Sequence, residues 1–154
     1  MSGLNLPPYL IKVVKKNGKN TIFDRLRKRY IILTPEEYVR QHFVEYLIQE
    51  KYFPEALLAN EVGIVLGKLK KRCDTIVYDR FLMPIAIVEY KSPSIAINQG
   101  TFDQIVRYNM RLKVPWLIVS NGLVHYCCNI NLENESYEFV EEIPKYDELL
   151  QKKL

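Results

Sequence analysis

The chain has 154 residues, of which 48% are hydrophobic and 26% are charged. This length predicts a single domain, and the apolar fraction is enough for a buried core, which excludes a disordered chain. No apolar run approaches membrane-spanning length, and the N-terminus lacks the basic-then-apolar pattern of a signal peptide. We therefore expect a soluble, cytoplasmic protein with no membrane partner.

The formal net charge of +4 is unevenly distributed along the chain. Residues 1–72 contain 14 basic and 7 acidic residues, whereas residues 73–154 contain 8 basic and 11 acidic residues. A basic N-terminal half is compatible with a polyanionic partner such as nucleic acid. It is equally compatible with a solvated charged surface.

The cysteines are three in number, Cys73, Cys127 and Cys128. Adjacent residues of a strand face opposite sides, so Cys127 and Cys128 do not form a ready-made metal pair. Because His42 and His125 are the only histidines, a zinc site is not expected. Reduced, buried thiols are the expectation for a cytosolic protein.

Residues 1–33 are predicted to form a basic N-terminal extension that contains a hairpin. Residues 10–14 and 21–23 have strand composition and flank Asn17-Gly18, a strong hairpin turn pattern. A dense basic cluster then precedes the apolar residues 30–33. This cluster either contacts phosphates or forms a charged loop; its members are Arg25, Arg27, Lys28 and Arg29.

A helix is predicted from Thr34 to about residue 49. Thr34 is the expected N-cap, Pro35 takes the first helical position, and Glu37 completes a capping box. The helical period places Glu36 on the apolar stripe and Glu37 well off it. An inward carboxylate needs a partner, so Glu36 is expected either to pair with Arg40 or to reach a metal site. The stripe consists of Val39, Phe43, Tyr46 and Leu47.

Residues 72–91 are predicted to form a hairpin around which the chain is organised, after a strand at 56–66. Asp74 begins its first strand, and Glu89 and Lys91 end its second, on the opposite face from Tyr90. Two carboxylates hold a hard cation through oxygen, and a nearby ammonium orients water or stabilises developing charge. The pattern is typical of a metal-dependent phosphodiesterase. The basic residues that lead into this hairpin are Lys70, Lys71 and Arg72.

A second helix is predicted over residues 99–112, after a loop at 92–94. Gln104 and Tyr108 are spaced i,i+4 and stack along the edge of its inner face, while Arg107 and Arg111 lie elsewhere and are available to a backbone phosphate. A buried strand at 114–120 ends at Asn121-Gly122. Two antiparallel strands at 123–130 and 137–143 and a short amphipathic or frayed tail at 145–154 follow.

The predicted fold is α/β, with the core order helix, strand, strand, strand, helix, strand over residues 34–121. The helix between two strands that lie parallel predicts a right-handed crossover and a mixed sheet. Residues 122–154 add antiparallel strands and the tail.

This set of residues resembles the PD-(D/E)xK nuclease superfamily, in the RecB-like group with a QxxxY pair. More narrowly, it resembles the N-terminal nuclease domain of the R (motor) subunit of type I restriction enzymes. The resemblance covers most of the chain. It is carried by Thr34-Pro35-Glu36-Glu37 with Val39-Arg40-Gln41, Lys71-Arg72-Cys73-Asp74, Val88-Glu89-Tyr90-Lys91-Ser92-Pro93, Phe102-Asp103-Gln104 with Tyr108-Asn109, and Ser120-Asn121-Gly122.

The resemblance implies a restriction-endonuclease-like core and Mg²⁺-dependent hydrolysis of DNA, with Mn²⁺ as a substitute. Asp74, Glu89 and the backbone carbonyl of Tyr90 would hold the cation, and Lys91 would be the catalytic lysine. Gln104 and Tyr108 would support that lysine and the scissile strand. Glu36 matches the acid of the first helix, and Glu37 is its rival for that position.

The chain departs from the family in two respects. A full R subunit continues into motor domains, so this chain is either a piece of a longer protein or a stand-alone relative. Cys73, rather than proline, precedes Asp74. A catalytically inactive nucleic-acid-binding or assembly module is the alternative, as is a domain that works only with motor, methylase or specificity subunits.

Overall fold

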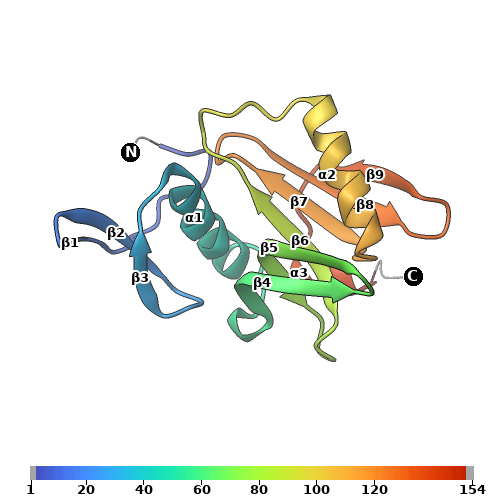
Figure 1. Cartoon of the computed structure of the whole chain (residues 1–154), viewed down its shortest axis with the longest axis horizontal. Helices are drawn as coiled ribbons and strands as arrows, with labels where there is room; N and C mark the ends of the chain where they lie inside the picture. Colours follow the sequence, from blue (N-terminus) through green and yellow to red (C-terminus); the bar gives the residue numbers. More distant parts are fainter. Residues whose placement is uncertain (1–2, 152–154) are drawn as a thin grey trace.

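The computed structural model describes residues 3–151, which form two β-sheets and the helices that cover them (Figure 1). The strands are β1 (Val13–Lys16), β2 (Lys19–Asp24), β3 (Arg29–Ile32), β4 (Leu58–Leu66), β5 (Leu69–Tyr78), β6 (Pro84–Tyr90), β7 (Trp116–Ser120), β8 (His125–Asn131) and β9 (Ser136–Val140). The helices are α1 (Pro35–Gln49), the 3-10 turn η1 (Glu55–Leu57), α2 (Gln99–Arg111) and α3 (Tyr146–Gln151). Among the described residues, no helix is both long and apolar enough to cross a membrane.

The larger sheet has the order β4-β5-β6-β7-β8-β9, and the smaller one has the order β1-β2-β3. Strands β6 and β7 are parallel and are connected through α2, whereas the other neighbouring pairs are antiparallel. The predicted order α1-β4-β5-β6-α2-β7 and the mixed sheet are therefore confirmed. Figure 1 shows the smaller sheet beside α1, away from α2.

Each face of the larger sheet has its own apolar cluster. Phe43, Val44 and Leu47 of α1 pack with Val88 and Tyr90 of β6. A second cluster on the α2 side combines residues of that helix with alternate residues of the strands, namely Cys73, Ile76, Ile87, Phe102, Val106, Leu117, Val119 and Cys128. Strands β6 and β7 are thus covered on both faces, which agrees with their nearly continuous apolar sequences.

Several predicted segments differ from the observed elements at their ends, among them the strands predicted at 114–120, 123–130 and 137–143, which are observed as β7, β8 and β9. The first strand begins at Val13 rather than at residue 10. The strand predicted from residue 56 begins at Leu58, because the chain after Pro54 first makes the turn η1, in which Leu57 N donates to Pro54 O at 3.0 Å. The predicted tail contains α3, which buries Tyr146 and Leu149, and its last residues, 152–154, lie outside the described part.

A chain of buried hydrogen bonds joins the end of β2 to the larger sheet. Asp24 Oδ2 accepts from Asn60 Nδ2 at 3.1 Å, and Asn60 Oδ1 accepts from Thr75 Oγ1 at 2.6 Å. Thr75 Oγ1 lies 2.9 Å from the hydroxyl of Tyr90. Asp24 has no exposed surface and also accepts from the backbone N–H groups of Leu26 and Arg27. The small sheet is therefore fixed to strands β4, β5 and β6 through polar contacts.

The Asn121-Gly122 turn after β7 predicts a measurable effect of one added methyl group. Gly122 has φ +86°, and a Cβ there would lie 2.8 Å from Leu4 Cδ2 and 3.1 Å from Val39 Cγ2. Gly122→Ala should lower the free energy of unfolding by about 2 kcal/mol or more, through backbone strain and overpacking. Urea unfolding measures this loss.

Gly67→Ala is the matched control for that substitution. Gly67 also has a positive φ, +61°, but no atom outside the turn would lie within 4 Å of a methyl group added there. Gly67→Ala should lower the free energy of unfolding through backbone strain alone, by about 1 kcal/mol. Equal losses in the two variants would contradict the packing role assigned to Leu4 and Val39.

Candidate active site

The two predicted acids lie on neighbouring strands at the place where the β5–β6 ladder ends. Its last pairs there are Ile76 with Ile87 and Thr75 with Val88, so Asp74 and Glu89 are the next residues of the two strands. Asp74 Oδ2 accepts a hydrogen bond of 2.9 Å from the backbone N of Tyr90. This bond replaces a ladder contact and holds the Asp74 carboxylate next to the end of β6.

Strands β4 and β5 are irregular where Asp74 lies. Asn60 pairs with Thr75 and Val62 pairs with Cys73, and Glu61 between them has φ 58°. Thr75 contacts Tyr90 on the α1 side, whereas Cys73 packs in the cluster on the α2 side. The side chains of β5 therefore change faces at Asp74, so that Cys73 and Lys71 face α2, while Arg72 between them pairs with Glu61 on the other face.

Glu89 is a buried carboxylate, with 9% of its surface exposed. Burial raises its pKa, and the negative charge of Asp74 raises that pKa further, which outweighs the opposing effects of Lys71 and Lys91. Its Oε1 atom is buried and has no hydrogen-bond partner among the described residues. The two acids thus repel one another in a site where water is largely excluded, an arrangement that a bound cation would relieve.

Lys71 is the residue that approaches Glu89 most directly. Its Nζ lies 2.9 Å from Glu89 Oε1, close enough for an ion pair although the ammonium is not aligned to donate a hydrogen bond. The same ammonium lies 5.3 Å from the ring centre of Tyr108. The sequence indicated Lys71 only as one of several nucleic-acid contacts, so its pairing with Glu89 was missed.

Lys91 follows the last residue of β6, and its position is fixed by the neighbouring parallel strand. Its backbone N donates to Ser120 O at 2.9 Å. The side chain is half-buried, and its charge lowers the pKa of Glu89. The structure therefore brings Asp74, Glu89 and Lys91 to one end of β5 and β6.

The predicted pair on α2 is divided between two environments. Tyr108 reaches β5, because its hydroxyl donates to Lys70 O at 3.2 Å. The side chain of Gln104 is exposed on the helix and makes no hydrogen bond within residues 3–151. The tyrosine therefore supports the strand that carries Lys71 and Asp74, while the amide faces solvent.

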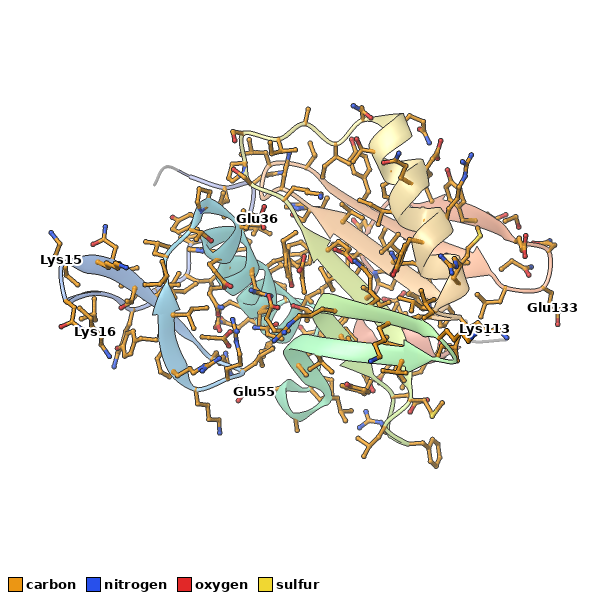
Figure 2. All side chains as sticks on the ribbon, in the orientation of Figure 1. Lys15, Lys16, Glu36, Glu55, Lys113 and Glu133 are labelled. Carbon is orange, nitrogen blue, oxygen red and sulfur yellow. The ribbon has the colours of Figure 1, made fainter. Side chains whose placement is uncertain are left out.

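The prediction that Glu36 points inward is wrong. Glu36 is exposed near the start of α1 (Figure 2), and Glu37 pairs with Arg40 instead. The buried surface of α1 includes the polar residues Arg40 and Gln41, so it is wider than the apolar stripe alone indicates. Thr34 is the N-cap as predicted, since its Oγ1 accepts from the backbone N of Glu37 at 3.1 Å, whereas the Glu37 carboxylate contacts Arg27, Arg40 and Gln41 instead of completing a capping box.

Arg40 connects this helix to the acidic site. Its Nη1 atom donates to the backbone carbonyl of Asp74 at 2.8 Å, and its Nη2 atom lies 2.8 Å from Glu61 Oε1. The side chains of Glu37 and Glu61 hold Arg40 charged and raise its pKa, even though burial opposes the charge. The first helix thus contributes to the position of Asp74 through Arg40 and Glu37, and Glu36 takes no part in these contacts.

The basic residues predicted to contact nucleic acid fall into two groups. Several are engaged within the chain: Arg25 with Glu45 and Glu55, Arg27 with Asp24 and Glu37, Lys71 with Glu89, and Arg72 with Glu61. The others are exposed, namely Lys28, Arg29, Lys70, Arg107 and Arg111.

A groove of about 400 Å³ lies along β4 and β5 next to the acids. We call it the β4–β5 groove. Its charged residues are basic apart from one glutamate, and the full lining consists of Glu61, Gly63, Ile64, Val65, Lys70, Lys71 and Arg72. The side chains of Lys70 and Arg72 alternate with that of Lys71, so they lie on the opposite face of β5 from Glu89.

The donor set fits a hard divalent cation better than a soft one. No group of three or more His, Cys, Asp or Glu side chains within residues 3–151 is arranged to hold a metal ion. The site instead offers two carboxylates, one of which has a buried oxygen whose charged neighbour is the ammonium of Lys71 at 2.9 Å. Mg²⁺ is commonly bound by one or two carboxylates and completes its shell with water and substrate phosphate.

Comparisons with known proteins concern the family and the fold of the chain. The family model described as "Type I restriction enzyme R protein N terminus" matches residues 35–144. The fold resembles a solved fragment assigned to the HsdR subunit of a type I restriction enzyme from Vibrio vulnificus YJ016, with a TM-score of 0.53 and 20% identity. That match covers 77% of this chain and 25% of the other, so this chain spans about a quarter of the length of its structural relative. No curated protein matches the chain.

The matched region begins at the first residue of α1 and extends past β9, and it contains Asp74, Glu89, Lys91 and Tyr108. It covers well over half of the chain. The chain therefore belongs to the family of N-terminal domains of type I restriction enzyme R proteins.

Proposed function

We propose that this domain hydrolyses DNA phosphodiester bonds with Mg²⁺, as an endonuclease domain with a restriction-endonuclease-like core. The observation that carries the proposal is the pair Asp74 and Glu89 at the end of β5 and β6, with Lys91 beside them. Membership of a restriction-enzyme family supports the same reaction class.

Asp74, Glu89 and the backbone carbonyl of Tyr90 would hold the cation, and Mn²⁺ would substitute for Mg²⁺. When bound, such a cation polarises the phosphate and lowers the pKa of a water molecule. Lys91 orients the attacking water or stabilises the charge that develops on the phosphate. Tyr108 keeps β5 in place through the carbonyl of Lys70. The exposed basic residues and the β4–β5 groove bind the DNA backbone.

A plasmid nicking assay tests the proposal. The wild-type protein with Mg²⁺ should convert supercoiled DNA to open circles, and EDTA should stop the reaction. Asp74→Ala should lower the rate by about 10³-fold, since it removes a cation ligand, and Lys91→Ala by about 10²-fold. Arg80→Ala, in the loop at the opposite end of β5, is the control and should cleave normally. Equal rates for all of these proteins would refute the proposal.

The family also supports a proposal about the protein partners of this domain. We propose that the domain acts in the cytoplasm, in a restriction complex with motor, methylase and specificity subunits. Activity that appears only after those subunits are added would assign the domain a dependent role within the complex.

A non-catalytic module that binds nucleic acid or assembles the complex is the second candidate. It is favoured by the ammonium of Lys71, which lies 2.9 Å from Glu89 Oε1 and gives that carboxylate a counter-charge without a metal. This candidate predicts DNA binding that weakens with salt, survives Asp74→Ala and requires no divalent cation.

A further inference from the structure

Lys71 lies on the side of the Glu89 carboxylate where a divalent cation would have to bind. Its Nζ lies 2.9 Å from Glu89 Oε1, the buried oxygen without a hydrogen-bond partner. A divalent ion bound to that oxygen would lie within a few ångströms of the ammonium. Two positive charges at about 4 Å repel one another by several kcal/mol at the effective dielectric of a partly buried site. Cation and ammonium therefore compete for the same oxygen.

The surroundings of Lys71 provide another place for its charge. About a quarter of the side chain is exposed, 24%, on the α2 side of β5, where Arg111 lies 5.7 Å from the ring centre of Tyr108. A lysine side chain is a flexible stem that can rotate while its backbone stays fixed. Tyr108 fixes that backbone through Lys70 O and lies beside the ammonium.

We propose that Lys71 is a displaceable counter-ion, which leaves Glu89 for a DNA phosphate on the α2 side of β5, beside Tyr108 and Arg111, when a divalent cation binds to the acids. This inference rests on the proposed function and adds a positioning residue to it. Without DNA, Lys71 holds Glu89 and opposes cation binding. A phosphate beside Arg111 takes the ammonium and makes the oxygen available.

The consequence is a reciprocal coupling between two ligands. If DNA raises the affinity for the cation, the cation must raise the affinity for DNA by the same factor. Coupling of this kind usually amounts to about 5-fold to 150-fold in binding. It would keep the site free of cation until a DNA backbone lies beside Lys71 and Arg111.

Binding measurements test this without relying on cleavage. Ca²⁺, a hard cation with oxygen ligands, is titrated by calorimetry with and without a short DNA duplex, and duplex affinity is measured by anisotropy with and without Ca²⁺. Lys71→Met removes the charge and keeps the length of the side chain. Lys68→Met, in the exposed β4–β5 turn, is the matched control for the loss of one positive charge.

The wild-type protein and Lys68→Met should each show coupling of about fivefold or more in both titrations. Lys71→Met should bind Ca²⁺ more tightly in the absence of DNA, by about fivefold, and its coupling should fall to near one. Absence of coupling in the wild-type protein, or equal Ca²⁺ affinity and coupling in the two lysine variants, would overturn the role of Lys71. Neither result would touch the nuclease proposal, which fails separately if Asp74→Ala leaves Ca²⁺ binding and nicking unchanged.

Discussion

Glu89→Gln should abolish DNA nicking without destabilising the fold. The amide has nearly the same shape as the carboxylate but is a neutral and poor ligand for Mg²⁺. Loss of the cation removes several kcal/mol of transition-state stabilisation, so the nicking rate should fall by about 10³-fold.

The stability of Glu89→Gln should stay the same or rise, although its nicking rate falls. Burial and the charge of Asp74 raise the pKa of Glu89, so the folded protein binds a proton at this group more readily than the unfolded chain does. The ionised group therefore costs stability, and that cost grows as the pH rises from the usual value of 4.5 through the folded pKa. Glutamine does not ionise and carries no such cost at neutral pH.

Thermal unfolding at about pH 7.5, read by circular dichroism, measures this effect beside the nicking assay. We expect the midpoint of Glu89→Gln to equal or exceed that of the wild-type protein. Glu61→Gln is a suitable control, because Glu61 pairs with Arg40 and Arg72 and its pKa is lowered. That variant should unfold at a lower temperature. A large drop for Glu89→Gln would show that the pair with Lys71 contributes more stability than burial of the carboxylate removes.

Asp24→Ala should lower the free energy of unfolding by about 3 kcal/mol at pH 7. Asp24 is fully buried and holds two backbone N–H groups, the guanidinium of Arg27 at 2.6 Å and the amide of Asn60 at 3.1 Å. Alanine would leave these donors without an acceptor. Urea unfolding measures the loss, and Asp147→Ala, whose side chain is 80% exposed, should change stability little.

The loss of stability in Asp24→Ala should depend on pH in a defined direction. Burial alone would raise the pKa of Asp24, but hydrogen bonds from the backbone and side chain of Arg27 and from Asn60 outweigh burial and lower it. A lowered folded pKa gives stability that is present above the usual value of 3.8 and is lost as the pH falls through the folded pKa. The difference between wild type and Asp24→Ala should therefore shrink below about pH 4. A constant difference from about pH 7 to about pH 3 would contradict this role for the ionised carboxylate.

Local patterns in the sequence predicted the central elements correctly. The apolar run of β6 and the N-cap at Thr34 each depend on neighbouring residues alone, and both were found as expected. The order of strands and helices around α2 then predicted that β6 and β7 are parallel, and the register of these strands agrees.

The contact between Lys71 and Glu89 could not be predicted in this way. A regular strand would put Lys71, Cys73 and Thr75 on one face, and Thr75 faces α1. The irregularity at Glu61 and Asp74 turns alternate residues before Asp74 toward α2, so that Lys71 reaches Tyr108 and Glu89. Nothing in the residue types there indicates it, since a glutamate with positive φ has no clear sequence pattern.

The wrong prediction that Glu36, rather than Glu37, points inward has a different cause. The helical period of the apolar residues alone favoured Glu36, but Arg27 and Arg40 cover the Glu37 side of α1. Tertiary partners thus decided which acid is buried. Asp24 was missed for the same reason, because its partner Asn60 is 36 residues away.

The polar connection from Asp24 through Asn60 and Thr75 to Tyr90 limits where this domain can be truncated without loss of stability. Sequence similarity to the family starts at residue 35, yet Asp24, which ends this connection, lies before that boundary. Excising residues 1–34 would expose the Asn60 amide and remove Arg27, a partner of Glu37. The cooperative folding unit is therefore larger than the homologous segment, and proteolytic trimming should stop ahead of β2 rather than at α1.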